Sequence, residues 1–186
     1  MPEKLVILDR DGVINEDSDA FIKSVEECHL LPGSIEAIAR LTQAGYTIIV
    51  ATNQSGLARG LFDEYTLARI HQFIIEQVEV AGGKIAAFFY CPHGPDDGCE
   101  CRKPLPGLLL RAEGELSLSV KGCHFVGDSL RDLQAATAAG CLPVLVKTGK
   151  GQKTITNGLP AELINTSVYV SLSDFVDNLL SDREAD

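Results

Sequence analysis

Residues 5–12 read LVILDRDG, an apolar run that leads directly into two carboxylates and a glycine. The run Leu5 to Leu8 predicts a buried β-strand, because short apolar runs bounded by turn residues are typical of one. Side chains two residues apart on extended backbone share a face, so Asp9 and Asp11 are expected to point into one cleft. Two acids in one cleft indicate metal binding or acid–base chemistry, although the same D-x-D-G pattern alone fits a surface turn equally well.

Strand-like and helix-like stretches alternate along the rest of the chain, which predicts an α/β fold with a parallel sheet covered by helices. Residues 15–28, 91–106 and 148–160 fall outside the alternation, and loops of that length are usually functional or mobile. The pattern predicts further strands at 47–51, 86–90, 123–126, 144–146 and 168–170, and helices at 34–44, from Asp63 to Gly82-Gly83, and at 107–115, 130–139 and 173–180.

The composition is that of one globular domain. The chain has 186 residues, of which 45% are hydrophobic, and we expect residues 1–186 to form a single domain. Sixteen basic and 26 acidic side chains give a formal net charge of −10, which argues against nucleic acid and anionic membrane surfaces as partners. No apolar run approaches the roughly 18 residues of a membrane span and no signal-like segment is evident, so we expect a cytoplasmic protein. We also expect a monomer.

Three later strand ends carry further chemical groups. The second predicted strand leads into TNQSG at 52–56, which offers a hydroxyl and backbone N–H groups to a phosphate, although such a sequence alone is more often a capped turn. CRKP at 101–104 alone fits a solvated basic pair, and GDSLRD at 127–132 alone fits a helix N-cap. Because the ends of parallel strands open onto one crevice, the four strand ends together predict one site.

In this order, D-x-D, Thr, Lys and G-D-x-x-x-D over residues 5–132 resemble the haloacid dehalogenase-like phosphohydrolases. The resemblance implies a three-layer, doubly wound, mostly parallel sheet and a phosphoryl-transfer reaction. It implies that Asp9 attacks phosphorus to form an aspartyl-phosphate, and that Asp11 is the general acid and base. It further implies that Thr52 and Lys103 hold the remaining phosphoryl oxygens.

The same resemblance implies a magnesium site. Mg²⁺ would bind the Asp9 carboxylate, the Asp11 backbone carbonyl and the Asp128 carboxylate, because hard cations prefer oxygen ligands. Asp132 would orient Lys103 or a water on the metal.

Three cysteines and a histidine cluster within eleven positions: Cys91, His93, Cys99 and Cys101. Three thiolates and one imidazole complete a tetrahedral Zn²⁺ site, and we favour this over free thiols. Catalytic zinc keeps an open position, so a complete set indicates a structural zinc that stiffens the loop carrying Arg102 and Lys103.

The short spacing between motifs, the zinc loop and CRKP resemble a branch that lacks a separate cap domain and acts on heptose bisphosphate or histidinol phosphate. DRDGVIN, TNQSGLARG, CRKPLPG and VKTGK favour the heptose bisphosphate enzymes, whose product feeds activated heptose into a bacterial surface glycan such as lipopolysaccharide. Ser129 stands where some relatives carry lysine and Phe21 where others have tyrosine, which leaves the anomer of the sugar open.

Without a lid, substrate choice is expected to come from loops. The resemblance implies substrate contacts from Asp17, Ser18, Asp19, Ala20, Thr52, Asn53, Gln54, Ser55, Arg102 and Lys103. Among these, Arg102 discriminates best, because its guanidinium can hold a second phosphate or sugar oxygens with two hydrogen bonds.

Other functions remain open at this point. Histidinol phosphate is the nearest alternative substrate, and Asp17 and Asp19 could meet its cationic end. A phospho-accepting receiver domain also uses Asp, Thr, Lys and Mg²⁺, but its acceptor comes later in the chain and lacks an acid two residues on. A purely structural zinc module leaves Asp9, Asp11 and Asp128 unexplained, and the acidic surface opposes a nucleic-acid phosphatase.

Overall fold

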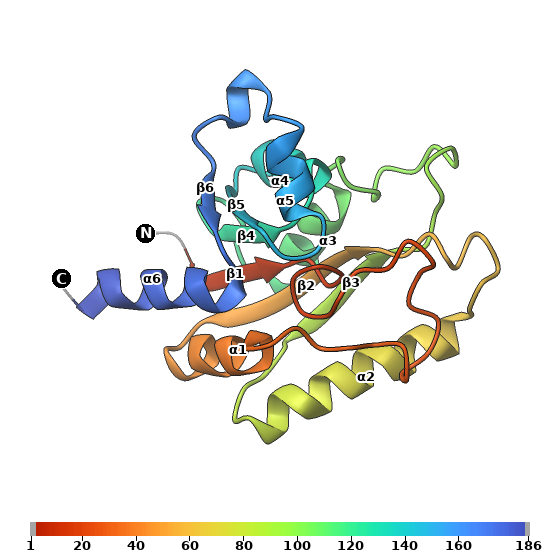
Figure 1. Cartoon of the computed structure of the whole chain (residues 1–186), viewed down its shortest axis with the longest axis horizontal. Coiled ribbons are helices and arrows are strands. Elements are labelled where there is room, and N and C mark those ends of the chain that lie inside the picture. Colours follow the sequence, from red (N-terminus) through yellow and green to blue (C-terminus); the bar gives the residue numbers. More distant parts are fainter. Residues whose placement is uncertain (1–2, 185–186) are drawn as a thin grey trace.

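The computed structural model describes residues 3–184, which form a central sheet between two layers of helices (Figure 1). The strands are β1 (Leu5–Leu8), β2 (Thr47–Asn53), β3 (Ala87–Cys91), β4 (His124–Gly127), β5 (Leu142–Val146) and β6 (Ser167–Tyr169). The helices are α1 (Ser34–Gln43), α2 (Glu64–Val80), α3 (Gly107–Leu116), α4 (Leu130–Ala138), α5 (Gly151–Thr156), a 3₁₀ turn at Ala161–Leu163, and α6 (Leu172–Glu184).

The strands lie in the order β3-β2-β1-β4-β5-β6, and all of the paired strands are parallel. The chain therefore winds outward from β1 in one direction through β2 and β3, and in the other through β4, β5 and β6. Ligands of such sheets bind at the carboxyl ends of the strands where the winding direction changes. That point lies between β1 and β4, so the fold places the ends of these two strands at the expected ligand crevice.

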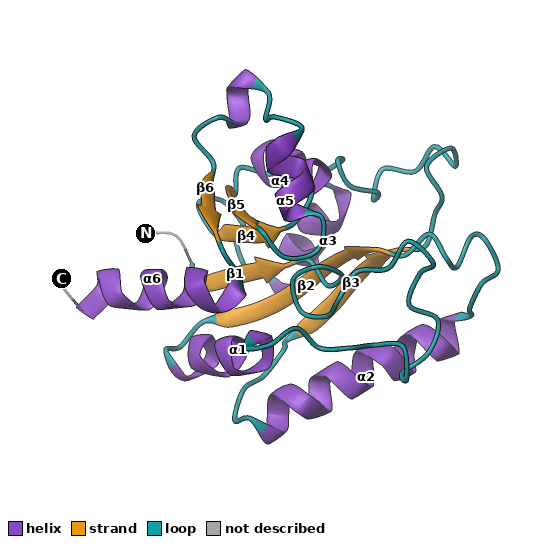
Figure 2. Cartoon of the chain, in the orientation of Figure 1, coloured by secondary structure: helices purple, strands orange, loops and turns teal. Residues whose placement is uncertain are grey.

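The side chains of β1 alternate between the two faces of the sheet. Val6 and Leu8 pack in a core with α1, α2 and α6, whereas Leu5 and Ile7 pack in a second core with α3 and α4. Figure 2 shows these helices on opposite sides of the strands. Burial on both faces explains why this strand is continuously apolar. Truncation of Ile7 to alanine is expected to cost about 2–5 kcal/mol of stability.

The longest helix, α2, begins where the sequence predicts. The Asp63 carboxylate caps it by accepting a hydrogen bond from the Thr66 backbone N–H at 2.8 Å. Of the apolar side chains that predict its buried face, those at 67, 70, 74 and 78 are buried, whereas Ala81 is half-buried and caps the end of the helix. Across the described part of the chain, no helix combines the length and apolarity required to cross a lipid bilayer.

The predicted α/β architecture is confirmed, and most element bounds differ from the predicted ones by one or two residues. Two differences are larger. The 148–160 stretch, expected to be irregular, contains α5, whose six residues are too few to show a helical apolar period. Helix α6 continues to Glu184 rather than ending at Leu180, because its last turn carries no apolar residue that the pattern could register.

Candidate active site

The first acid of the D-x-D-G segment continues the β1 ladder. The Asp9 backbone N–H donates to the Val126 carbonyl of β4 at 2.9 Å, so its carboxylate stands at the point where the winding direction changes. Gly12 closes the segment with φ +84°, and a Cβ there would overlap the Asp128 carboxylate. Glycine is therefore required for the turn to pass beside Asp128, which follows β4.

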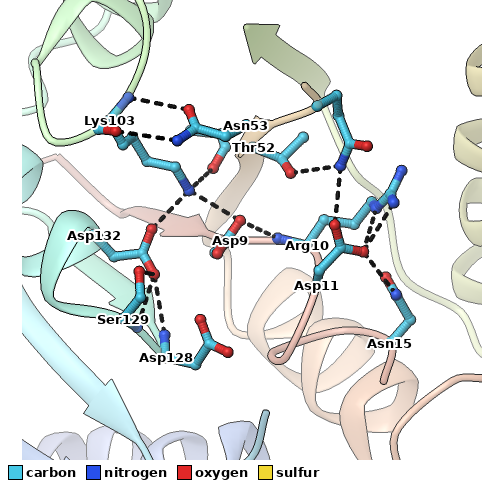
Figure 3. Close-up of polar contacts among 12 residues, drawn as sticks. Asp9, Arg10, Asp11, Asn15, Thr52, Asn53, Lys103, Asp128, Ser129 and Asp132 are labelled. Atoms are coloured by element: carbon cyan, nitrogen blue, oxygen red, sulfur yellow. Dashed lines mark hydrogen bonds and ion pairs between the residues drawn. The ribbon is translucent and has the colours of Figure 1, made fainter. Parts of the chain in front are cut away.

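Lys103 lies at the centre of the acidic groups (Figure 3). Its Nζ lies 2.9 Å from Asp9 Oδ1 and 2.7 Å from Asp132 Oδ1, and it donates to the Ala51 carbonyl at 2.8 Å. Burial disfavours the ammonium, but the charges of Asp132 and Asp9 outweigh burial and raise the pKa of Lys103. The side chain is therefore a fixed, buried cation.

The carboxylates of Asp9, Asp128 and Asp132 lie within 4.8 Å of one another. Burial, followed by the charge of Asp132, raises the pKa of Asp9 to about 7, and burial with the charges of Asp132 and Asp9 raises the pKa of Asp128 to about 8. A bound cation would relieve the repulsion between these neighbouring carboxylates. Both oxygens of Asp132 already have partners, Oδ1 in Lys103 and Oδ2 in groups at the start of α4, whereas Asp9 contacts Lys103 through Oδ1 alone. Asp9 and Asp128 are therefore the carboxylates that fit a magnesium ion, which prefers oxygen ligands.

Asp132 has a separate set of partners at the start of α4. Its Oδ2 accepts from the backbone N–H groups of Asp128 and Ser129, both at 3.1 Å, and from the Ser129 hydroxyl at 2.9 Å. Burial opposes its charge, yet Lys103 outweighs burial and lowers the pKa of Asp132. The predicted orienting role for Asp132 thus has a geometric basis in its contact with Lys103.

The second acid of the motif, Asp11, is turned away from Lys103 (Figure 3). Its Oδ1 accepts from Arg10 Nε at 3.0 Å, Arg10 Nη2 at 2.8 Å and Asn15 Nδ2 at 2.9 Å, and its Oδ2 accepts from Gln54 Nε2 at 3.0 Å. Burial alone would raise the pKa of Asp11, but the Arg10 charge and these hydrogen bonds hold it below its usual value. No local pattern in the sequence indicates the roles of Arg10 or Asn15, because burial of a polar side chain leaves no such pattern.

Residues 52–55 all line the cavity, and two of them also contact other residues of the site. Gln54 bridges Asp11 to the Thr52 hydroxyl, to which it donates at 3.0 Å. Asn53 accepts from the Lys103 backbone N–H at 3.0 Å and donates to the Lys103 carbonyl at 3.1 Å. Both amides line the cavity, as does Ser55, but they also hold Asp11, Thr52 and Lys103 in place.

The 15–28 loop and the loop that carries Lys150 meet beside Asp128. Lys150 donates its backbone N–H to Asp128 Oδ2 at 2.8 Å, and its Nζ lies 3.1 Å from Asp17 Oδ2 and 3.8 Å from Asp19 Oδ1. The 15–28 loop is thereby joined to the loop that supports Asp128. Ala20, which was expected to contact substrate, is exposed and lies outside the cavity lining.

These groups surround a cavity of about 300 Å³. Its lining includes every side chain predicted to be catalytic, the Asp128 carboxylate, and most of those predicted to contact substrate. It also includes Arg59, Arg131 and Lys150, which were not among the predicted site residues. Arg59 and Lys150 reach the cavity from loops and Arg131 from the first turn of α4, and no spacing in the sequence indicates these positions.

The predicted zinc ligands converge at the end of β3. Cys91 Sγ lies 3.6 Å from Cys99 Sγ and 3.1 Å from Cys101 Sγ, and His93 Nδ1 lies 3.6 Å from Cys91 Sγ and 3.4 Å from Cys101 Sγ. Zinc–sulfur bonds of about 2.3 Å place tetrahedral sulfur ligands roughly 3.8 Å apart, so the set fits Zn²⁺. None of the six cysteines, all of which lie within residues 3–184, forms a disulfide.

The chain is similar to known phosphatases over nearly its whole length. It is 55% identical over 179 residues to D-glycero-β-D-manno-heptose-1,7-bisphosphate 7-phosphatase of Bordetella bronchiseptica, covering 96% of this chain and 99% of that protein. It is 46% identical to the enzyme of the same name from Neisseria meningitidis serogroup A, covering 98% and 97%.

A solved structure extends this similarity to three dimensions. The crystal structure of D,D-heptose 1,7-bisphosphate phosphatase from B. bronchiseptica, complexed with magnesium and phosphate, matches with a TM-score of 0.91 and 54% identity over 98% of this chain and 99% of that chain. The HAD-hydrolase-like family model matches residues 100–174. The chain therefore belongs to the heptose-1,7-bisphosphate 7-phosphatase family of HAD-like hydrolases.

Proposed function

We propose that this chain removes the 7-phosphate of D-glycero-β-D-manno-heptose 1,7-bisphosphate in a Mg²⁺-dependent reaction. The observation that carries the proposal is the single cavity that gathers Asp9, Asp11, Thr52, Lys103 and Asp128. The β anomer, which the sequence left open, is proposed from the names of relatives that are up to 55% identical.

In the first step, a carboxylate oxygen of Asp9 attacks phosphorus and the bond from phosphorus to the C7 oxygen breaks. Asp11 has a lowered pKa in the substrate-free protein, and the negative charge of the bound phosphate would raise it so that Asp11 can carry a proton. Asp11 gives that proton to the departing oxygen, so the sugar leaves as an alcohol and Asp9 carries the phosphoryl group. Lys103 Nζ and the Thr52 hydroxyl are placed to stabilise the phosphoryl oxygens, because Lys103 contacts Asp9 and Thr52 lines the same cavity, where Gln54 links it to Asp11.

In the second step, water attacks phosphorus of the aspartyl-phosphate and Asp11 takes its proton. The bond from phosphorus to the Asp9 oxygen breaks, releasing inorganic phosphate and regenerating both carboxyl groups. Gln54, Asn15 and Arg10 position Asp11 for both proton transfers through the four hydrogen bonds described above. A covalent intermediate thus divides one difficult displacement into two easier ones.

Magnesium held by Asp9, Asp128 and the Asp11 carbonyl would neutralise charge on the transferred phosphoryl group. Hydrogen bonds within the chain hold the residues of this position in place. Lys150 fixes Asp128 through its backbone N–H, and the Thr148 hydroxyl donates to the Gly12 carbonyl at 2.7 Å. Asp132 keeps Lys103 charged and directed at Asp9.

The proposed zinc site supports the loop that delivers two cationic side chains. Arg102 and Lys103 follow Cys101 directly, and Arg102 Nη1 donates to the His93 carbonyl at 3.3 Å. A tetrahedral set of four ligands leaves no open position for substrate. Zn²⁺ is therefore proposed as a structural ion.

Histidinol phosphate is the second candidate substrate. Asp17 and Asp19 could meet its cationic end, but both lie near Lys150, which reduces their attraction for a second cation. Arg102 lines the same cavity and would repel an amine while attracting a phosphate. The charges therefore favour the bisphosphate, whose product would enter activated-heptose synthesis for a surface glycan such as lipopolysaccharide in the cytoplasm. We propose that the enzyme acts there as a single-domain monomer.

The test is phosphate release with and without Mg²⁺ from both anomers of heptose 1,7-bisphosphate and from histidinol phosphate, with Asp9→Asn as the blank. The proposal predicts that the β anomer gives the highest kcat/KM of the three substrates. It also predicts that Asp9→Asn releases no phosphate from any of them. A higher kcat/KM for histidinol phosphate would move the function to the second candidate. Phosphate release from none of the three would contradict both.

A further inference from the structure

His71 lies in the middle of α2 and does not line the active-site cavity, yet it contacts the residue between the two acids of the D-x-D motif. Its Nε2 lies 3.2 Å from Nη1 of Arg10, and both side chains are buried. The two residues are 61 positions apart in the sequence, so the fold brings them together. Helix α2 therefore reaches the site through Arg10, although it carries none of the catalytic residues.

The chemistry of the two groups determines which of them donates. A guanidinium carries only hydrogen-bond donors, so Arg10 Nη1 donates and His71 Nε2 accepts. His71 is therefore neutral, with its proton on Nδ1. Burial and the Arg10 charge favour this state, because together they lower the pKa of His71 to about 3.

Aromatic side chains of β3 hold the His71 ring in place. The ring stacks on that of Phe88, with 4.2 Å between the centroids and 17° between the planes, and its centroid lies 6.2 Å from that of Tyr90. Ile70 and Ile74 of α2 pack in the same core as Phe88. Because packed side chains in a core occupy defined rotamers, the acceptor at Nε2 has a fixed position.

The Arg10 guanidinium depends on this acceptor for its orientation. Its Nε and Nη2 both donate to Asp11 Oδ1, at 3.0 and 2.8 Å (Figure 3). Two bonds that meet at one oxygen leave the guanidinium able to pivot about that oxygen. The bond to His71 holds the opposite nitrogen, and within residues 3–184 Nη1 contacts no other acceptor. Loss of the acceptor would leave a buried donor unpaired.

The orientation of Arg10 in turn determines which oxygen of Asp11 can exchange a proton. Oδ1 accepts two hydrogen bonds from Arg10 and one from Asn15 Nδ2, whereas Oδ2 accepts only from Gln54 Nε2. An oxygen that already accepts three hydrogen bonds has no lone pair left for a proton, so Oδ2 is the oxygen that reacts. Because Asp11 lines the cavity, a shift of Arg10 would turn Oδ2 away from the substrate.

We propose that His71 is a positioning residue for the phosphatase reaction and acts through Arg10 on the Asp11 carboxylate. The inference rests on the proposed function, in which Asp11 gives a proton to the leaving oxygen and takes one from water. His71 touches neither the substrate nor the reacting atoms. Its Nε2 fixes the guanidinium, which holds Oδ1 of Asp11 and thereby directs Oδ2. A displaced proton donor slows the chemical steps and leaves substrate binding largely unchanged.

The experiment separates the hydrogen bond from the packing with two variants of His71. His71→Phe keeps a ring that can stack on Phe88 but has no acceptor, whereas His71→Gln loses the ring and offers a side-chain oxygen to Arg10 Nη1. The kcat and KM of both are measured with the heptose bisphosphate at saturating Mg²⁺. His124→Phe and His124→Gln are the matched controls, because His124 also packs against a phenylalanine, Phe175, and lies outside the cavity lining.

His71→Phe is expected to lower kcat about three- to tenfold and to leave KM within about twofold, because Asp11 loses its orientation and keeps its charge. His71→Gln and both His124 variants are expected to keep kcat within about twofold of the wild type. A role in packing alone would make His71→Gln the more damaging substitution. That order, equal losses in both His71 variants, or a loss confined to KM would overturn the proposal.

A measurement on the wild-type protein tests the proposal even if His71→Phe does not fold. The NMR chemical shifts of the imidazole nitrogens, assigned by comparison with His71→Gln, report which nitrogen carries the proton. The expected result at neutral pH is a proton on Nδ1 and none on Nε2, and a proton on Nε2 would overturn the proposal. If the wild type releases no phosphate, the proposed function fails and the positioning role fails with it. If the wild type is active and a folded His71→Phe matches it, the positioning role alone fails.

Discussion

The Arg10 guanidinium holds the Asp11 carboxylate from two nitrogens, with Nε at 3.0 Å and Nη2 at 2.8 Å from the same oxygen. Arg10 is fully buried, and its third nitrogen, Nη1, lies 3.2 Å from His71 Nε2. Arg10, the residue between the two acids of the motif, therefore extends into the protein interior and holds the Asp11 carboxylate from that side.

Arg10→Lys is expected to lower kcat about 10- to 100-fold with little change in KM, because a single ammonium cannot reproduce this fork and Asp11 loses its orientation. Steady-state kinetics on the bisphosphate, with an unfolding curve to confirm the fold, measure the effect. Arg111→Lys is the control on an exposed arginine. A loss confined to KM would contradict a role in positioning the proton donor.

His71 is expected to make stability depend on pH. Burial, together with the Arg10 charge, lowers its pKa from 6.5 to about 3. The unfolded chain then binds a proton below pH 6.5 that the folded protein does not, so this contribution is complete above pH 6.5 and is lost as pH falls toward 3. Relative to His71→Gln, the wild-type free energy of unfolding is predicted to fall by up to about 1.4 kcal/mol per pH unit in this window.

Denaturant unfolding of both proteins between pH 8 and 4 measures that difference. A pH-independent difference would show that His71 is not held neutral in the fold. The comparison is made between the two proteins because Asp9 and Asp128 also titrate, and their contribution is common to both.

Asp132→Asn is expected to reduce kcat/KM at least tenfold, because Lys103 loses the carboxylate 2.7 Å from its Nζ. The start of α4 also loses charge at its capping box, which adds about 1 kcal/mol of destabilisation. Asp63→Asn, which alters the cap of α2, provides the matched control. The double variant with Lys103→Met is expected to lose less than the sum of the two single losses, and strict additivity would contradict coupling.

Loss of zinc is expected to weaken activity indirectly. In Cys99→Ser/Cys101→Ser, the bound zinc measured by metal analysis should fall to zero and the melting temperature should drop. The kcat/KM should fall because Arg102 and Lys103 follow the cluster directly. Cys28→Ser, a buried cysteine outside the cluster, controls for thiol removal. A zinc-free protein with unchanged kcat/KM would contradict the supporting role of the site.

The strands and the chemistry at their ends could be predicted because each leaves a local pattern. Leu5 to Leu8 is continuously apolar, and Asp9 and Asp128 follow strands that the fold makes neighbours. The contributions of Arg59 and Lys150 could not be predicted, because loop packing brings them to the cavity, and that of Arg131 could not because its spacing from the other site residues matches no motif. Gln54 was predicted as a substrate contact, but its hydrogen bond to Asp11 and the role of Arg10 could not be predicted, because a buried polar side chain is recognised by partners that are distant in sequence.

The central claim, that Asp9 carries the phosphoryl group and Asp11 is needed to release it, is tested most directly by trapping the intermediate. Asp11→Asn is mixed with Mg²⁺ and an aryl phosphate, whose leaving group needs no proton, and the reaction is quenched in acid for peptide mass analysis. The account predicts one added phosphoryl group on the peptide containing Asp9, and none in Asp9→Asn. An unmodified Asp9 peptide, or a phosphoryl group on another residue, would contradict it.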